Sequence, residues 1–148
     1  APSFNAYRRF QPGNHAPTES AWGYDNRTTA IRIPESPPSA RRIEHRVAGA
    51  DANPYLVLAA VLAGIWHGIE GKLTLPPAIE GNAWDQDIKA TPLPTTMDQA
   101  IDAFDGAQTL SEYLTTEFKT LFLATKKQEW SEFARHVTEF ELETYLRM

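Results

Sequence analysis

The distribution of proline divides this 148-residue chain into two regions that can fold in different ways. All eleven prolines lie between Pro2 and Pro94, and the residues after Pro94 contain none. Proline breaks helix interiors and cannot donate a hydrogen bond inside a sheet. The first region is therefore restricted to short strands, loops and helices that begin at a proline, whereas the second can form longer helices. These constraints predict an α+β chain with its strands first and most of its helices last.

Local patterns place the elements more closely. Residues 1–20 are rich in Pro, Gly, Asn and Ser, which is typical of a loop. Asn53-Pro54 opens an apolar helix at 53–70, with proline in the first turn where its missing N–H costs nothing. The apolar run is shorter than a bilayer span, so we expect this helix to be buried in the protein. The other predicted elements are strands at 21–24, 28–33 and 41–47, an irregular segment at 71–95, and a tail at 96–148 with helices near 97–104, 109–123 and 126–148.

Every basic residue in the first third of the chain is an arginine. Up to Val47 there are seven arginines and four acids, a balance of +3, although the whole chain carries −5. Arginine presents a planar fork that binds carboxylates and phosphates in bidentate fashion, whereas lysine acts as a point charge. An all-arginine positive segment on an acidic protein indicates a concave site for a small polyanion, and a nucleic-acid reader is usually basic overall. The alternative is a set of solvated surface arginines.

The third predicted strand carries the sharpest chemical pattern. Side chains alternate between the faces of a strand, so Arg42, Glu44 and Arg46 are expected to project from one face. One interpretation is a ladder of salt bridges. The other is a carboxylate ligand for Mg²⁺ or Mn²⁺ between two anion-binding arginines, because these ions prefer oxygen ligands and bound phosphates. Arg32 lies between two isoleucines on the second strand, as expected of a half-buried strand that lines a cleft.

Several common sites are missing from the sequence. The chain has no cysteine, which excludes disulfides and thiolate metal sites and fits a reducing, cytoplasmic compartment. The four histidines do not have zinc-site spacing. No P-loop and no dinucleotide fingerprint is present, so any ATP must be held by another device. We expect neither a nucleic acid nor a membrane as a partner.

Four ordered blocks of sequence resemble the glutamine synthetase family. The blocks are Asn5 to Gly13 followed by Ala16-Pro17, Trp22 with Asn26-Arg27-Thr28 and Ile31 to Pro34, Ala40 to Arg46, and Ala52 to Leu56. Beyond residue 70 the match is looser. This resemblance implies that residues 1–148 are the C-terminal portion of the catalytic domain, with residues 1–20 as its substrate loop. It also implies an antiparallel, barrel-like sheet backed by helices.

The resemblance assigns roles to six charged residues and implies ATP and Mg²⁺ or Mn²⁺ as cofactors. By this resemblance Arg9 and Arg46 hold the carboxylates of glutamate. Arg27 stabilises the transferring phosphoryl group, and Arg32 and Arg42 contact the ATP phosphates. Glu44 resembles a ligand of the catalytic metal ion. The implied reaction has two steps. ATP phosphorylates the γ-carboxylate of glutamate, and an amine then displaces phosphate from the acyl phosphate.

The loop at residues 12–17 departs from the pattern of the ammonium-using members. Those members carry Pro-Gly-Tyr-Glu-Ala-Pro, whereas this chain reads Pro-Gly-Asn-His-Ala-Pro. His15 therefore stands where a glutamate helps to bind and deprotonate ammonium. A neutral imidazole accepts a proton near pH 7, but it does not attract a cation as a carboxylate does. His15 is either a catalytic base or an exposed loop residue without a catalytic role.

Two further stretches indicate the class of amine. Residues 22–27 and Arg8-Arg9-Phe10 are similar to the γ-glutamylpolyamine synthetase branch of the family. We therefore expect a glutamate-amine ligase that uses a polyamine or another organic amine. Glutamine synthesis from ammonium is the alternative.

The resemblance also has consequences for assembly. In this family the active sites form between subunits of a homo-oligomeric ring, and the other metal ligands lie upstream of the position of Ala1. This chain alone is accordingly expected to be inactive, and its exposed sheet edge to pair with another copy. Two readings of other classes stay open: a catalytically silent, structural or regulatory member of the family, and a stand-alone module that binds polyanions.

Overall fold

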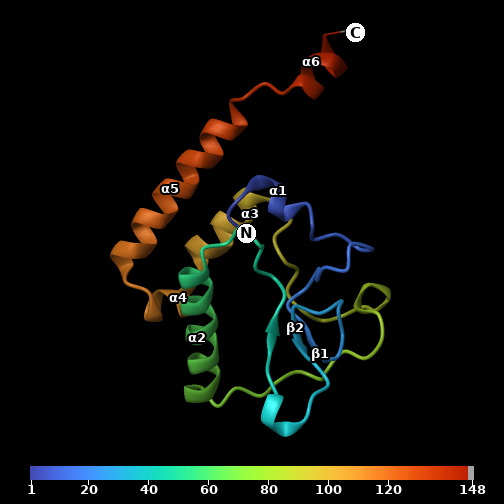
Figure 1. Ribbon diagram of the computed structural model, residues 1–148. Helices are drawn as coiled ribbons and strands as arrows, with labels where there is room; N and C mark the ends of the chain where they lie inside the picture. The colour runs from blue at the N-terminus through green and yellow to red at the C-terminus, as the bar shows by residue number, and fades with distance from the viewer. Residues whose placement is uncertain (147–148) are drawn as a thin grey trace. The chain divides into compact units, whose positions relative to one another are not determined.

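The computed structural model describes residues 1–146 and contains two compact units, Ala1–Ala100 and the residues from Ile101 onward. The first unit holds a small sheet, and the second is helical (Figure 1). The α+β class expected from the sequence is confirmed. Short helical turns punctuate the first unit at α1 (Phe4–Tyr7), η1 (Pro38–Ala40) and η2 (Ala83–Asp85).

Three short strands form a mixed sheet in the order β1-β2-β3. Strand β2 (Ile31–Ile33) pairs antiparallel with β3 (Glu44–His45), which places Arg32 opposite Glu44. On its other side β2 pairs parallel with β1 (Trp22–Tyr24), so the expectation of a wholly antiparallel sheet is wrong for this pair. The reason is that the chain does not turn directly from β1 into β2 as in a hairpin. It first returns to the end of the sheet where β1 begins, and β2 then runs in the same direction as β1.

That loop is built by side chains that bind the backbone. Asp25 has a φ of 47°, in the left-handed region that Asp and Asn tolerate better than most residues. The Asn26 side-chain oxygen accepts from the backbone N–H of Thr28, which forms a tight turn. The buried Thr29 hydroxyl bonds to the carbonyls of Asn26 and Ile31 at 3.0 Å each. These local bonds compete with strand pairing, and they explain why β2 begins at Ile31 and not at residue 28.

The third strand is also shorter than expected. The structure assigns only Glu44–His45 to β3, whereas the sequence predicts a strand over 41–47. Proline starts the 3-10 turn η1, and the residues after it are extended but unpaired up to Glu44. The partner strand β2 ends at Ile33, directly before Pro34, which has no N–H to donate to residues ahead of Glu44. After β3 the Arg46 N–H still donates to the Ala30 carbonyl at 2.9 Å.

Helix α2 (Pro54–Glu70) has the expected position but not the expected burial. Its start is fixed by Asn53, whose side chain accepts from the backbone N–H groups of Tyr55 and Leu56. Among the described residues of α2 only Ala63 is buried, and Leu62 and Trp66 are 55% and 54% exposed. The expectation of a buried helix is thus wrong for this chain. Apolar side chains become buried only where another element packs on them, and no described residue covers most of this helix.

The irregular segment at 71–95 is tied to the sheet by backbone hydrogen bonds. The Ile79 N–H donates to the Trp22 carbonyl at 2.9 Å, and the Trp22 indole N–H donates to the Pro76 carbonyl at 2.8 Å. Farther along, Ser20 and Leu93 donate to the carbonyls of Thr91 and Thr18. The segment therefore lies along β1 and is hydrogen-bonded to it. The buried apolar core of this unit comprises Tyr7, Phe10, Ala16, Ala21, Ala30, Ala63, Ala83 and Met97.

The C-terminal helices differ in their boundaries from the sequence prediction. Helix α3 (Met97–Gly106) is followed by α4 (Gln108–Tyr113), α5 (Thr116–Ala134) and α6 (Glu139–Tyr145). The break expected near 124 is absent, because α5 begins after its N-cap Thr115 and continues through this position to Ala134. The last predicted helix is interrupted before α6, and its final residues, 147–148, lie outside the described residues. Within residues 1–146 no helix combines the length and apolar character needed to cross a membrane.

The close approach of β1 to the 71–95 segment depends on a glycine, which gives a first prediction. A Cβ added to Gly23 would lie 2.6 Å from the Ile79 carbonyl oxygen, closer than real Cβ contacts allow. We expect Gly23→Ala to lower the free energy of unfolding by about 1–3 kcal/mol, because backbone atoms have to move apart. Denaturant-induced unfolding measures this change.

The matched control is Gly64→Ala in α2, where nothing lies within 4 Å of the added carbon. Alanine is the better helix former there, so this variant should be neutral or stabilised by up to about 1 kcal/mol. Equal stability of Gly23→Ala and the unmodified protein would contradict the tight packing of β1 on Ile79.

Candidate functional site

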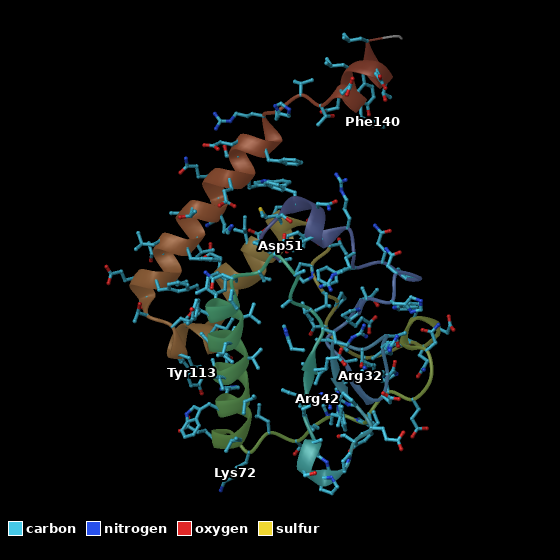
Figure 2. The ribbon with its side chains drawn as sticks, in the orientation of Figure 1. Arg32, Arg42, Asp51, Lys72, Tyr113 and Phe140 are labelled. Atoms are coloured by element: carbon cyan, nitrogen blue, oxygen red, sulfur yellow. The ribbon has the colours of Figure 1, made fainter. Side chains whose placement is uncertain are left out.

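Arg32 occupies the centre of the sheet and is held by two carboxylates. It lies on β2 (Figure 2), where its Nη1 donates to Glu44 Oε2 at 2.8 Å and its Nη2 donates to Asp25 Oδ1. The Arg32 side chain is 17% exposed, whereas those of Asp25 and Glu44 are 55% and 42% exposed. The two acids come from different places, one after β1 and one on β3. The arrangement therefore fixes the plane of the guanidinium from both sides.

The protonation of this triad is set by its own contacts. The hydrogen bond from Arg32, followed by the attraction of its positive charge, holds the pKa of Asp25 below its ordinary value. The hydrogen bonds to Asp25 and then to Glu44 raise the pKa of Arg32 above its already high value. Asp25 and Arg32 thus form a charged pair at neutral pH.

Arg46 connects the loops around the triad. Its Nη1 donates to the Arg27 carbonyl, its Nη2 donates to the His15 carbonyl at 3.0 Å, and its Nε lies 3.9 Å from Glu44 Oε1. The Arg46 side chain is only 15% exposed, and this burial lowers its pKa. One guanidinium therefore joins the loop at residues 12–17, the turn after β1 and the third strand.

A pocket opens beside the triad. Its volume is about 510 Å³, and the residues that line it are Tyr24, Asp25, Asn26, Arg27, Arg32 and Gly81. The pocket contains two guanidinium groups and one carboxylate, so its side chains carry a net positive charge. Such a pocket is suited to an anion that arginine forks can bind.

Asn26 holds the far wall of the pocket in place. Its Nδ2 donates to the carbonyls of Ile79 and Gly81 at 3.0 and 2.8 Å, while its Oδ1 accepts from the backbone N–H and the hydroxyl of Thr28. The Thr28 hydroxyl also accepts from the backbone N–H of Ala83 at 2.9 Å. The side chain next to Arg27 thus determines where the 79–83 segment lies.

Two of the predicted arginines lie apart from this cluster. Arg9 donates from Nη2 to the Val47 carbonyl and its guanidinium lies 4.8 Å from the centre of the Phe10 ring. Its buried Nε has no hydrogen-bond partner among the described residues. Arg42 is exposed on the segment before β3 (Figure 2), where its Nη1 donates to the Ala40 carbonyl at 3.4 Å. The structure therefore brings together Arg32, Glu44 and Arg46 but not all five predicted arginines.

His15 lies in the loop at residues 12–17, where its carbonyl accepts a hydrogen bond and its side chain is exposed. Its φ of 48° is in the left-handed region, which histidine adopts more readily than most residues. Its ring lies 6.2 Å from that of Trp84, whose indole N–H donates to the Ala16 carbonyl at 3.3 Å. The carbonyl of His15 accepts from Arg46, so the loop is connected to the arginine cluster by its backbone.

Sequence reasoning missed four of the residues that line the pocket: Tyr24, Asp25, Asn26 and Gly81. The Asp-Asn pair after a short strand is a turn signal, and it could have indicated a left-handed residue at this place. No sequence signal indicates that Asn26 reaches the 79–81 backbone more than 50 residues away. Gly81 has a φ of 73°, in agreement with its position in a tight bend of that segment.

The described residues supply only part of the ligand set of a divalent metal ion. Glu44 is a half-exposed carboxylate beside two arginines, and no group of three or more His, Asp or Glu suited to a metal occurs among residues 1–146. Mg²⁺ is commonly bound by one or two carboxylates together with substrate phosphates. Glu44 therefore fits as a single protein ligand of an ion that also contacts phosphate.

The sequence matches one family over nearly all of its length. The match is to the glutamine synthetase catalytic domain and covers residues 1–145. The chain is 45% identical over 147 residues to gamma-glutamylputrescine synthetase PuuA of Escherichia coli (strain K12), covering 99% of this chain and 31% of that protein. It is 39% identical over 142 residues to gamma-glutamylethanolamide synthetase GlnA4 of Streptomyces coelicolor (strain ATCC BAA-471 / A3(2) / M145), covering 96% of this chain and 30% of that protein.

The fold agrees with a solved structure as well. Superposition on the structure titled "Apo GmaS without ligand" gives a TM-score of 0.83 at 30% identity, covering 99% of this chain and 34% of that one. The chain thus spans about a third of the length of the relatives it matches.

The brace formed by Asn26 gives a second prediction. We expect Asn26→Ala to lower the free energy of unfolding by about 1–3 kcal/mol, because it removes a part-buried hydrogen bond to the Ile79 carbonyl and an exposed one to the Gly81 carbonyl. Asn26→Asp keeps the acceptor for Thr28 but points a carboxylate oxygen at the carbonyls of Ile79 and Gly81, and should cost at least as much. Chemical denaturation gives the stabilities, and amide exchange at Ile79 reports the release of the segment. Unchanged exchange at Ile79 in both variants would contradict the brace.

Proposed function

This chain belongs to the glutamine synthetase catalytic-domain family, a family of ligases, and we propose that its protein is an ATP-dependent ligase that joins glutamate to an organic amine. The observation that carries the proposal is the cluster of Arg32, Glu44 and Arg46 beside a pocket lined by Arg27. These residues coincide with the blocks that resemble the family's phosphate, metal and glutamate contacts. The names of two relatives, a gamma-glutamylputrescine and a gamma-glutamylethanolamide synthetase, support an organic amine.

The proposed reaction balances in two steps. In the first, an oxygen of the glutamate γ-carboxylate bonds to the terminal phosphorus of ATP, and ADP leaves. In the second, the amine nitrogen bonds to the carbonyl carbon of the acyl phosphate, which was the carbon of the γ-carboxylate, inorganic phosphate leaves, and the nitrogen loses a proton. The first step gathers negative charge around the transferring group, and fixed positive groups accelerate such transfers by stabilising that charge.

Each residue of the cluster has a defined part in this proposal. The exposed Arg27 side chain reaches solvent in the pocket and stabilises the transferring phosphoryl group. Arg32 and Arg42 contact the ATP phosphates, while Arg9 and Arg46 hold the carboxylates of glutamate. Arg46 has three further N–H groups beyond those given to the two backbone carbonyls, so it can bind an anion without releasing the loops.

The metal ion is proposed to bind at Glu44. When bound, Mg²⁺ or Mn²⁺ supplies positive charge that neutralises the phosphates of the nucleotide. Glu44 contributes one carboxylate to that ion. A homo-oligomeric ring and a cytoplasmic location complete the proposal, and both rest on the resemblance to the family.

The amine is the finer part of the proposal. His15 replaces the glutamate that the family's pattern places in the loop, and its exposed side chain makes no ion pair with a carboxylate within residues 1–146. An ammonium ion is small and requires an anionic site to be captured, whereas a longer amine gains binding energy from the rest of its chain. We therefore place a polyamine or ethanolamine-like amine before ammonium as the acceptor.

A phosphate-release assay tests the proposed activity directly. The protein in its natural length is given ATP, glutamate, Mg²⁺ or Mn²⁺, and one amine at a time from ammonium, putrescine, spermine and ethanolamine. We expect phosphate release with an organic amine to exceed release with ammonium by at least about tenfold in kcat/KM, which corresponds to a modest difference in transition-state binding. Omission of glutamate is the control.

The other outcomes are equally informative. Ammonium as the best substrate would keep the ligase and overturn the proposed amine. No turnover with any amine, from a protein that still binds ATP, would favour a catalytically silent member of the family.

Substitution at His15 tests the loop's part in choosing the amine. His15→Asp introduces a carboxylate through a residue that tolerates the left-handed backbone, and we expect it to raise kcat/KM for ammonium relative to putrescine about tenfold. His15→Asn is the matched control, because it suits the same backbone without the charge. A similar ratio of the two rates in both variants would assign His15 to the exposed loop without a part in amine selection.

A further inference from the structure

The two carboxylates that hold Arg32 differ in what else they do. Glu44 faces Arg32 across the β2–β3 pair, and its oxygens lie 2.8 Å from Arg32 Nη1 and 3.9 Å from Arg46 Nε. It is also the residue that the proposed function gives to the metal ion. Asp25 has Arg32 as its ion-pair partner in the structure, and the proposed function does not assign it to the metal ion.

The position of Asp25 is set by its backbone. Its N–H donates to the Ile33 carbonyl at 2.9 Å, which extends the β1–β2 pairing by one step. Its φ of 47° then turns the chain out of the strand, and the next residue, Asn26, is bonded to the 79–81 backbone. The carboxylate is therefore attached to a braced turn, although the side chain itself is half exposed.

Metal binding would change the balance between these two contacts. A carboxylate oxygen that coordinates a divalent cation has less negative charge to offer a guanidinium, and the cation also repels the guanidinium. Arg32 would then lose much of its attraction to Glu44 at the moment when it has to face the nucleotide phosphates. If Arg32 is released from Glu44, its side chain regains rotamer freedom, and that freedom has to be lost again when Arg32 binds a nucleotide phosphate.

We infer, on the basis of the proposed function, that Asp25 is a positioning residue that keeps Arg32 directed at the nucleotide phosphates when Glu44 binds the metal ion. Arginine has five N–H groups, and the two carboxylates use two of them. The Nε is buried and has no partner among the described residues, so the remaining N–H groups of the two Nη atoms are those available to a phosphate. Asp25 can therefore stay bound to Arg32 while the anion binds.

Asp25 could instead weaken nucleotide binding, and this effect has the opposite sign to the positioning role. A half-exposed carboxylate in a pocket for phosphates repels them, and its removal would then tighten nucleotide binding. That repulsion acts whether or not Glu44 is engaged. The positioning role instead makes the effect of Asp25 depend on the metal ion, and this dependence separates the two.

The test measures the Kd of a ribose-labelled fluorescent ATP for the protein in its natural length, without glutamate, with Mg²⁺ and with chelator. We expect Asp25→Asn to weaken binding about fivefold in Mg²⁺ and less than about twofold without it, a size typical of a partly exposed ion pair. Asparagine suits the left-handed backbone and removes only the charge, so the fold is expected to be retained, and thermal unfolding checks this. In a Glu44→Gln background the same substitution should weaken binding to a similar extent in both conditions, because Asp25 is then the charged partner that remains.

Asp87→Asn is the matched control, since it removes the same charge from an exposed residue outside the pocket and should leave Kd unchanged in both conditions. Tighter binding by Asp25→Asn, or an equal effect with and without Mg²⁺ in the presence of Glu44, would overturn the positioning role and leave the proposed function standing. Failure of the unmodified protein to bind the nucleotide in Mg²⁺ would overturn the proposed function and this inference with it.

Discussion

The candidate site depends on one partly buried cation, the guanidinium of Arg46. It donates to backbone carbonyls of two loops, those of Arg27 and His15, and lies within 3.9 Å of Glu44. A charge that is 15% exposed has lost much of its hydration, and it is tolerated because oxygen atoms replace the water around it. The same contacts bring the two loops to the strand that carries Glu44. The loops thus satisfy the cation, and the cation determines where the loops lie.

The sheet gives this arrangement its precision, although it is very small. The register of β2 with β3 sets Arg32 against Glu44, and the parallel register with β1 brings the turn at Asp25 to the same guanidinium. Neighbouring strands lie less than 5 Å apart, so side chains at paired positions meet without long reaches. Three strands of two or three residues are therefore enough to collect two acids and two arginines in one place.

How far the sequence predicted this site can be judged residue by residue. The alternation of side chains along a strand correctly placed Glu44 beside Arg46, because that rule depends only on local geometry. It did not extend to Arg42, since the chain before Glu44 is unpaired and its exposed side chain bonds to the nearby Ala40 carbonyl.

The parallel pairing of β1 and β2 was not predictable from strand patterns. It follows from a turn that Asp25, Asn26 and Thr29 build with side-chain hydrogen bonds. Helix α2 was located correctly, but its burial was not, because apolar composition reports a tendency to be covered and says nothing of what covers it.

The structure gives a reason for arginine over lysine at two positions of the lysine-free first 71 residues, Arg32 and Arg46. Arg46 binds two carbonyls and approaches a carboxylate, and Arg32 binds two carboxylates. Each still has N–H groups left, because a guanidinium carries five of them in a fixed plane. A lysine offers three donors on a single nitrogen, and two bonds to the protein would leave one for a ligand in a direction that the protein does not fix. A site in which the same cation both joins the loops and binds an anion therefore requires arginine at these positions.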